Sequence, residues 1–454
     1  MNLLRATKLV CVWTLILLCG GCGETYRQVI FTPPPNPPDP SGLHFVLSLS
    51  RNGAADPGAS TRIDVSGDTA VGVATSGAGP VHAGLAPDNT TVFVANSQED
   101  TVSSYSSTNA TQVTTTSLPA GSIPVFVATT QGGTMYVANY GNGTVSAIAT
   151  FTGGVTKTIS VGSQPVAMAG TPDAQKLYVA NRGSDNVTSI NMVDRTVNPP
   201  ISVGSAPSWV VARSDSARVY VLNSGDGSVS TINTTSDTVV GSLSLTAGAG
   251  ANFMFYDKRL NRIYVTNPSS MIVNVLDASG DAATLMSSLN LNAILGSSTI
   301  CATGCVPTSV TVLPDGSRAY VAVYTISGST INSYVFVADT LSHIVTKVVS
   351  LGSAAIDPVN PVGCDTSQFP NAARFRLFTV VSGDGSRVYV SNCDAGTTTT
   401  IRTAPNTAAG ASEPADSVVL NLLAPYSSFS GPDPQDPSST RPPRQNPVFL
   451  VAGP

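Results

Sequence analysis

Charged side chains are scarce in this chain of 454 residues: Asp, Glu, Lys and Arg together account for 11% of it, compared with about 25% in typical soluble proteins. The formal net charge is -5 at pH 7 and the pI is about 5.1. A chain without a general positive field attracts DNA and anionic lipid headgroups poorly, so nucleic acid is not an expected partner. Ser, Thr, Gly and Asn are expected to make the surface polar instead.

Histidine is also rare, occurring only as His44, His82 and His343. A Ser-His-Asp hydrolase needs a histidine beside its nucleophile, and no Gly-x-Ser-x-Gly motif stands between an expected strand and helix. All three histidines fall in expected strands, which favours structural roles. The sequence also lacks a Walker loop, a dinucleotide-binding fingerprint, a haem-attachment motif and an EF-hand loop. It therefore predicts no cofactor and no metal site.

The apolar run at residues 9–18 is about ten residues long, which is too short for a comfortable membrane span. Arg5 and Lys8 precede it, so the run predicts a signal peptide over residues 1–21. The stretch Cys19-Gly-Gly-Cys22 resembles a bacterial lipobox, which implies lipidation of Cys22 and a membrane anchor. Cys19 stands where that motif usually has Leu, so ordinary secretion and an uncleaved anchor stay open. By the same resemblance, Gly23 favours the outer membrane.

Proline is frequent in residues 22–42, above all between Thr32 and Pro40. Proline has no backbone N–H to give to a sheet and favours extended polyproline II structure. We expect a tether here, with a leader that has no spacing role as the alternative. Residues 43–454 are expected to form a single domain.

Near copies of one four-residue stretch, Tyr264-Val-Thr-Asn267, recur along this expected domain. Their first residues, the anchor aromatics, are Phe93, Tyr136, Tyr178, Tyr220, Tyr264, Tyr320 and Tyr389. The steps between successive anchors are 43, 42, 42, 44, 56 and 69 residues. A period in the low forties is typical of a four-stranded propeller blade. The predicted fold class is therefore all-β, a β-propeller of antiparallel blades.

The clearest blade spans residues 165–203, with strands expected at 165–170, 177–180, 187–190 and 197–203. Turns rich in Gly, Asn and Asp separate these strands. Seven anchors give seven blades, but residues 44–49, 61–65 and 69–75 look like the last three strands of another. The segment 446–454 resembles 164–172 and would supply the missing first strand, closing the ring from both termini. Eight blades are favoured, with seven blades plus decorating end strands as the alternative.

Four cysteines lie outside the leader: Cys301, Cys305, Cys364 and Cys393. In an exported chain an even number predicts two disulfides, for which three pairings are possible. A propeller places the connection that holds Cys364 and the turn that holds Cys393 on one rim. This favours Cys364–Cys393, which leaves Cys301–Cys305 as a local loop. A zinc site would need all four thiolates to converge.

The repeat of Tyr/Phe-Val-x-Asn, a turn rich in Gly, Ser and Asp, and Thr-Val-Ser resembles the YVTN-family β-propeller repeat proteins. Residues 136–146 are close to the family consensus, and the likeness covers residues 80–454 well and 43–79 loosely. One blade departs from it, with Val323 in place of Asn. Relatives include archaeal surface-layer proteins, periplasmic propellers and, more distantly, lactonase-like enzymes and quinoprotein subunits. The resemblance thus implies a fold and no catalytic residues.

Charged residues gather on the turns that follow the motif, and these are the candidate ligand-binding residues of one rim: Glu99, Asp100, Arg182, Asp185, Asp226 and Asp394. Solvated turn residues are the structural alternative. The motif asparagines present a similar choice between turn caps and a polar ligand ring, and turn caps are favoured. They are Asn96, Asn139, Asn181, Asn223, Asn267 and Asn392.

Together these features predict a monomeric, non-catalytic binding scaffold, held at a membrane by its lipid anchor. Its irregular rim would engage an envelope protein, a peptide or a glycan, because loops on a rigid scaffold are where binding usually resides. The alternative function is a lactonase-like hydrolase that uses carboxylates at the mouth of the propeller channel.

Overall fold

The computed structural model describes residues 44–53, 56–130, 132–246, 248–291, 300–301, 304–356, 364, 375–406, 413–426 and 444–453. The expected signal peptide at 1–21 and the expected tether at 22–42 lie outside these residues. The described part of the chain is almost wholly β. It contains no helix that is both long and apolar enough to cross a membrane.

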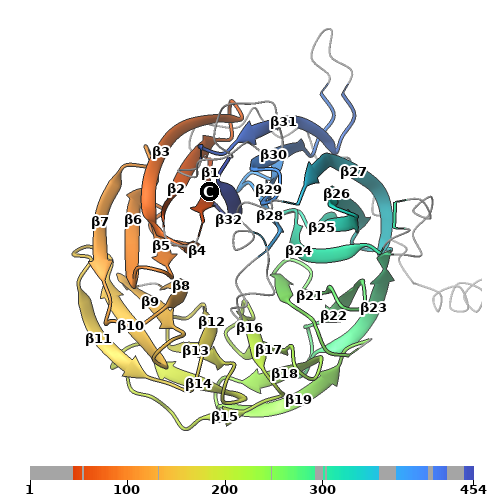
Figure 1. Cartoon of the computed structure of the whole chain (residues 1–454). Coiled ribbons are helices and arrows are strands. Elements are labelled where there is room, and N and C mark those ends of the chain that lie inside the picture. The colour runs from red at the N-terminus through yellow and green to blue at the C-terminus, as the bar shows by residue number, and fades with distance from the viewer. Residues whose placement is uncertain are drawn as a thin grey trace, which may run out of the picture. The chain divides into compact units, whose positions relative to one another are not determined.

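The strands form eight four-stranded antiparallel sheets, which follow one another around a common centre as the blades of a β-propeller (Figure 1). Blades 2 to 8 are antiparallel meanders that run from an inner strand to an outer one, and blade 1 takes its inner strand from the other end of the chain. From the inside outward, blades 1 to 4 consist of β32 (Asn446–Ala452), β1 (Phe45–Asn52), β2 (Asp56–Asp64) and β3 (Thr69–Ala78); β4 (Pro80–Leu85), β5 (Thr91–Asn96), β6 (Thr101–Ser106) and β7 (Gln112–Ser117); β8 (Pro124–Thr130), β9 (Thr134–Asn139), β10 (Thr144–Ala149) and β11 (Val155–Ser160); β12 (Pro165–Gly170), β13 (Lys176–Asn181), β14 (Asn186–Asn191) and β15 (Ile201–Ser202).

The remaining blades follow the same order. Blades 5 to 8 consist of β16 (Pro207–Ala212), β17 (Arg218–Asn223), β18 (Ser228–Asn233) and β19 (Thr238–Ser244); β20 (Phe253–Asp257), β21 (Arg262–Asn267), β22 (Ile272–Asp277) and β23 (Thr284–Asn290); β24 (Val306–Val312), β25 (Arg318–Ser327), β26 (Thr330–Asp339) and β27 (Ile344–Ala355); β28 (Leu377–Val381), β29 (Arg387–Asn392), β30 (Thr397–Arg402) and β31 (Ser417–Leu423).

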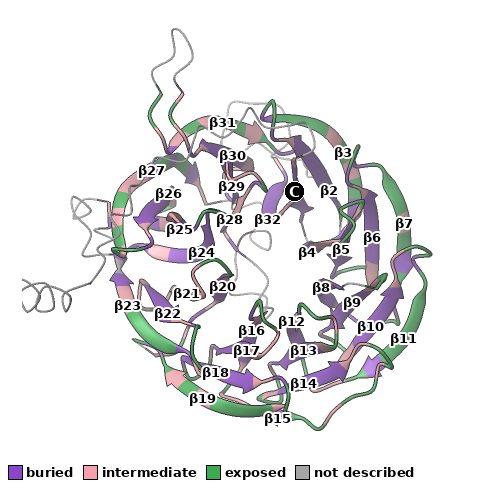
Figure 2. Ribbon diagram, turned by 180° about the vertical axis from the view of Figure 1, so that it is seen from behind, coloured by how far each residue is buried: buried purple, intermediate pink, exposed green. Residues whose placement is uncertain are grey.

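The anchor aromatics lie in the second strands, where their side chains are fully buried. Neighbouring blades cover both faces of a second strand, so apolar residues stand at successive positions instead of alternating with polar ones. Many residues of the outer strands are exposed, whereas most residues of the inner strands are buried (Figure 2). Each blade therefore buries its core against the next blade.

The ring is closed by strands from both ends of the chain. The C-terminal strand β32 pairs with β1 antiparallel, and Leu49 lies opposite Phe449. This confirms the predicted eight blades and the predicted closing strand. Closure removes the exposed inner edge that β1 would otherwise present.

A buried ion pair joins the last blade to the first. Arg387 and Tyr389 of β29 both reach Asp68, which lies in the turn between β2 and β3. The guanidinium Nε donates to the Asp68 carboxylate at 2.9 Å, and the Tyr389 hydroxyl donates to it at 2.9 Å. Burial, followed by the Asp68 charge, raises the pKa of Tyr389 above its usual value, so the phenol stays protonated and donates.

The arrangement of Arg387, Tyr389 and Asp68, here called a clamp, recurs at two other junctions between blades. In each clamp, a basic residue and the anchor tyrosine two positions later donate hydrogen bonds to one aspartate. This aspartate lies in the turn between the third and fourth strands of the next blade. The two sets are Lys176, Tyr178 and Asp237, and Arg318, Tyr320 and Asp416. All three clamp aspartates have positive φ, a conformation that Asp adopts more readily than most residues.

Two expectations about local structure are wrong. The fourth strand predicted at 197–203 is interrupted: Val197 forms an isolated bridge with Ile190 and Ile201–Ser202 form β15, because Pro199 and Pro200 between them have no N–H to donate to the neighbouring strand. Of the histidines, only His82 lies in a strand. His44 precedes β1, and His343 occupies the turn between β26 and β27 with φ of 56°.

Candidate functional site on one rim of the propeller

An antiparallel meander gives the propeller two different rims. The turns between second and third strands and the connections from one blade to the next form one of them, here called the connection rim. The turns between first and second strands and between third and fourth strands form the opposite one, here called the hairpin rim. All six charged candidate residues lie on the connection rim.

Asp100 ties its turn to the connection that leads into blade 3. Its two carboxylate oxygens accept hydrogen bonds from the backbone N–H groups of Gly121 and Ile123, each at 2.7 Å. A carboxylate that accepts two backbone N–H groups is held in place by charge-assisted hydrogen bonds.

Two further candidate aspartates hold the connection between blades 4 and 5 from its two sides. Asp185 accepts the backbone N–H of Ala206 at 2.7 Å, and Asp226 accepts that of Ser205 at 2.8 Å. The other oxygen of Asp226 accepts the backbone N–H of Ser228 at 3.1 Å. These contacts fix the start of β16.

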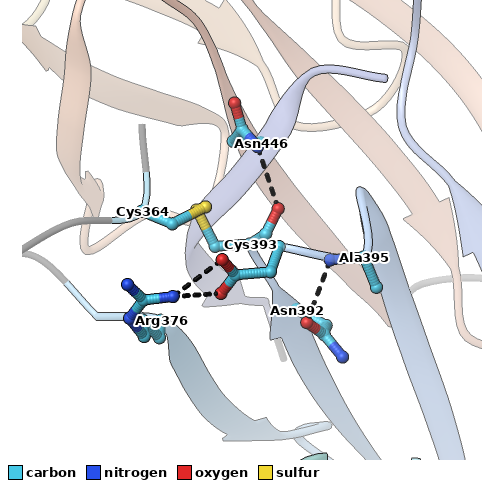
Figure 3. The surroundings of a disulfide bond; sticks show 7 residues. Cys364, Arg376, Asn392, Cys393, Ala395 and Asn446 are labelled. Atoms are coloured by element: carbon cyan, nitrogen blue, oxygen red, sulfur yellow. Dashed lines mark hydrogen bonds and ion pairs between the residues drawn. A yellow bond between two sulfur atoms is a disulfide. The ribbon is translucent and has the colours of Figure 1, made fainter. Parts of the chain in front are cut away.

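Asp394 is buried and lies within an ion pair. Its carboxylate receives both hydrogen bonds from one nitrogen of Arg376, at 2.7 and 2.8 Å. The neighbouring Cys393 is joined to Cys364 by a disulfide, and its carbonyl accepts the side-chain amide of Asn446 at 3.0 Å (Figure 3). The other disulfide joins Cys301 and Cys305, so the favoured pairing is present.

The two remaining candidates differ in their surroundings. Glu99 is exposed at the tip of its turn, whereas Arg182 is half-buried beside a cavity. Burial raises the pKa of Tyr140 on the preceding blade, and the charge of Arg182 opposes this rise, which places the two groups close together. Arg182 lines that cavity, and Glu99 lies on an exposed turn of the same rim.

The motif asparagines are buried, with at most 1% of each residue accessible to solvent. In four blades the side-chain N–H groups donate to side-chain oxygens five and seven residues later, as Asn139 does to Thr144 and Ser146, both at 2.9 Å. Asn267 and Asn392 instead accept backbone N–H groups of their own turns. The asparagines therefore support the turns and present no ligand ring.

The channel at the centre of the ring is lined by the inner strands. One residue of each inner strand lies opposite the residue two positions after the anchor aromatic, or opposite Leu49 of β1. These eight residues are His82, Phe126, Ala167, Trp209, Phe253, Ser309, Phe378 and Phe449. A β-bulge precedes most of them and turns the side chain inward.

Six of these residues form a closed circle of ring contacts, here called the aromatic collar. Neighbouring ring centroids are 3.8 to 5.7 Å apart, and the circle passes over the small side chains of Ala167 and Ser309. Phe375 packs against three members, Trp209, Phe253 and Phe378. Apolar rings thus occupy the channel at this level.

His82 belongs to the collar and has a structural role. It stacks on Phe126, and its Nδ1 accepts the backbone N–H of Val127 on the next blade at 3.2 Å. Burial lowers its pKa to about 3, so the ring is neutral at physiological pH. A neutral, enclosed imidazole that accepts a backbone N–H is poorly placed to act as a general base.

A cavity of about 260 Å³ opens on the connection rim between blades 4, 5 and 6. Its polar side chains are Arg182, Ser208, Ser224 and Asn252. The hydroxyl of Ser224 donates to that of Ser208, while Asn252 donates to the carbonyl of Thr308 at 3.1 Å. The cavity combines one cation with neutral hydroxyls and exposed backbone.

The groups around the cavity can be compared with those that a metal site or a serine nucleophile needs. No group of three or more His, Cys, Asp or Glu that could hold a metal ion occurs among the described residues. In the cavity, neither serine hydroxyl has a histidine or a carboxylate as its hydrogen-bond partner within the described ranges. The arrangement can hold a small polar ligand.

The rim was predictable from the sequence, whereas the collar, the clamps and the cavity were not predicted. The collar could have been predicted from the repeat, since its members occupy the same position when the inner strands are aligned. The clamp aspartates lie one blade away from their partners. Only the register of the blades brings them together.

Comparisons with known proteins identify the fold and no family. No protein-family profile and no curated protein matches the sequence. Among solved structures, the dihydro-heme d1 dehydrogenase NirN in complex with DHE is similar with a TM-score of 0.61 and 12% identity, over 90% of this chain and 75% of that one. A functionally unknown protein from Desulfotomaculum acetoxidans is similar with a TM-score of 0.50 and 15% identity, over 73% of this chain and 98% of that one. The hydrazine synthase of Kuenenia stuttgartiensis aligns with a TM-score of 0.48 and 18% identity, over 67% of this chain and 88% of that one.

Proposed function

We propose that this chain is a monomeric, non-catalytic binding scaffold of the cell envelope, similar to the YVTN-repeat propellers, which engages a protein, a peptide or a glycan through its connection rim. One observation carries the proposal: side chains tie the turns and connections of this rim to one another. Asp100, Asp185 and Asp226 hold connections, and the Cys364–Cys393 disulfide holds a further segment. A surface fixed in this way loses little conformational entropy when a partner binds.

The lactonase-like alternative requires carboxylates that are open to a substrate at the channel mouth. Both oxygens of Asp226 already accept backbone N–H groups, and Asp394 is paired with Arg376. Glu99 is exposed but has neither a hydrogen-bonded nucleophile nor a second open carboxylate described beside it. These contacts favour the scaffold over the hydrolase.

Export and anchoring form the second part of the proposal. The signal peptide would end at residue 21, Cys22 would carry the lipid, and residues 22–42 would tether the propeller to the outer membrane. Replacing Cys22 by Ser is expected to move most of the protein from the membrane fraction to the soluble one, because the covalent anchor is lost. Immunoblots of fractionated cells measure this, with Ser41→Ala in the same expected tether as the matched control that keeps the anchor and both disulfides. Unchanged membrane association of the Cys22→Ser chain would refute lipidation at this residue.

Rim binding is tested by a photo-crosslinking amino acid placed at single positions of the full chain in its native envelope. Position 99 on the connection rim is expected to give adducts with a partner. Position 194 on the hairpin rim, also an exposed acidic residue in a turn, is the matched control and is expected to give few. Adducts that form equally from both positions, or only from position 194, count against the proposed function.

A further inference from the structure

A second cavity opens on the hairpin rim, where threonine replaces a basic residue of the repeat. Each of these basic side chains, two positions before an anchor aromatic, reaches the turn between the third and fourth strands of the next blade. They are Lys176, Arg218, Arg262, Arg318 and Arg387. In blade 3 the residue is Thr134, whose side chain is too short to cross that junction. A cavity of about 290 Å³, here called the hairpin-rim cavity, lies there between blades 3 and 4.

The facing turn of blade 4 also departs from the clamps. Arg195 stands where each clamp has aspartate, with a similar positive φ of 59°. Its guanidinium donates to the hydroxyl of Thr156 at 2.9 Å and to that of Thr134 at 3.4 Å. The anchor Tyr136 of blade 3 therefore lies near a guanidinium, whereas the clamp tyrosines donate to a carboxylate.

Three hydroxyl groups line the hairpin-rim cavity, and their contacts decide what each can still do. Thr130 donates to the carbonyl of Thr134 at 2.9 Å, so its oxygen remains able to accept. Thr134 accepts from Arg195, so its proton remains available to a ligand. Burial raises the pKa of Tyr136, and the nearby charge of Arg195 opposes this rise, so the phenol is protonated at neutral pH and can donate.

Met192 of blade 4 also lines the cavity. Its carbonyl accepts no hydrogen bond within the part of the chain that the structure describes. In five other blades the carbonyl at this repeat position accepts an ammonium or guanidinium group from the preceding blade. These carbonyls belong to Ser107, Thr234, Ala278, Thr340 and Thr403. The hairpin-rim cavity therefore offers a ligand both hydrogen-bond donors and acceptors.

The formal charges around the cavity balance. Lys157 and Arg195 are the cations, and Lys157 donates to the Arg195 carbonyl at 2.7 Å. Asp173 and Asp194 are the anions, on the two turns of blade 4 that border the cavity. None of the described residues that line the cavity is charged. A charged ligand would lose hydration there without gaining an opposite charge in the lining, so a neutral ligand is favoured.

The two most exposed large apolar side chains of the described residues belong to turns at this cavity. Phe151 is 99% exposed and Val193 is 76% exposed. Val193 lines the cavity. Thr150, next to Phe151, donates its N–H to the carbonyl of Gly133, in the turn that also contributes Gly132 to the lining. Apolar groups exposed beside a cavity mark a surface that a ligand can cover.

We infer that the hairpin-rim cavity binds one ring of a neutral sugar. The sugar hydroxyls accept from Tyr136 and Thr134 and donate to the carbonyl of Met192, while a C–H face of the ring covers Val193 and Phe151. A sugar ring suits this lining because it carries donors and acceptors at its edge, apolar C–H groups on its faces and no net charge. The cavity volume admits a single ring. This site lies on the rim opposite to that of the proposed function and goes beyond it.

The test is a ligand-observed NMR titration of the full chain with glucose, galactose, mannose and N-acetylglucosamine. At least one is expected to bind with a dissociation constant below about 10 mM. The uronate and the 2-amino derivative of the sugar that binds are expected to bind about tenfold more weakly, because their charges find no partner in the lining. A trisaccharide of the same sugar distinguishes two sources. Binding as tight as that of the monomer identifies the end of a glycan, and weaker binding identifies a free sugar.

Tyr136→Phe is expected to weaken sugar binding about fivefold or more, because one hydrogen bond is lost. Blade 2 has phenylalanine at this position, the buried Phe93, so the variant is expected to fold. Tyr178→Phe makes the same change in blade 4, where Lys176 crosses the junction. It is the matched control and is expected to bind sugar as the wild type does.

A second variant fills the cavity. Thr134→Lys combined with Arg195→Asp rebuilds, between blades 3 and 4, the clamp that Lys176, Tyr178 and Asp237 form at the next junction. The rebuilt clamp is expected to keep the urea midpoint of the wild type. It is expected to lose saturable sugar binding, because the lysine side chain occupies the cavity.

The inference is overturned if no neutral sugar saturates the wild type or if the charged derivatives bind as tightly as the neutral sugar. It is also overturned if either Tyr136→Phe or the rebuilt clamp binds sugar as the wild type does. The proposed function is tested apart from this cavity by repeating the crosslinking from positions 99 and 194 in the chain with the rebuilt clamp.

Discussion

Replacing Asp68 by Ala is expected to lower the free energy of unfolding by about 3 to 5 kcal/mol, because it leaves a buried guanidinium without its partner. The side chains of Arg387 and Asp68 are only 8% and 9% accessible to solvent. Tyr389 loses its acceptor in the same step. The loss falls at the junction where blade 8 meets blade 1, so it weakens closure of the ring directly.

Urea denaturation followed by circular dichroism measures the effect of Asp68→Ala. The matched control is Asp281→Ala, which removes the acidic partner of Arg218 from an ion pair whose carboxylate is 95% exposed. An exposed pair contributes about 0 to 1 kcal/mol, so this variant is expected to stay close to the wild type. If both variants unfold at the same urea concentration, the clamp has no special role in closing the ring.

Replacing Trp209 by Ala is expected to cost about 3 to 5 kcal/mol, because the collar loses one of its largest side chains and a cavity remains. Trp209 contacts Phe126, Phe253 and Phe375, so three rings lose a neighbour at once. The backbone accepts Ala at this repeat position, as Ala167 does in blade 4. The expected cost therefore reflects lost packing and not a misplaced strand.

The same denaturation measurement tests the collar. Val240→Ala removes an apolar side chain that is 45% exposed on the outer strand of blade 5, and it is expected to change stability by no more than about 0.5 kcal/mol. A loss below about 1 kcal/mol in Trp209→Ala would show that the collar residues do not pack as one cluster.

The blade architecture was predictable because each blade repeats the same local signals. A second strand that carries the anchor Tyr or Phe at its third residue, usually ends with Asn and is followed by a polar turn predicts the meander without any long-range information. The closing strand at 446–454 could be recognised for the same reason, since Asn446 to Gly453 repeats the pattern of the first strand of blade 4. Where local chemistry broke the pattern, as at Pro199 and Pro200, the predicted strand was too long.

The candidate site was predictable only as a location. The turns that carry Asp100, Asp185 and Asp226 were placed on one rim, but their carboxylates bond to backbone N–H groups about 20 residues away along the chain. Nothing in a turn sequence shows which connection will pass beneath it. Charged residues that suggested a ligand site therefore serve mainly to hold the rim, and the cavity lies beside them.

The proposed binding function requires a difference between the two rims, and the most direct measurement is the ratio of partner adducts formed from position 99 to those formed from position 194 in the native envelope. A rim held rigid for binding predicts a ratio well above one, which persists when the positions are moved to other exposed turns of the same two rims. A ratio near one, or below it, would contradict the account.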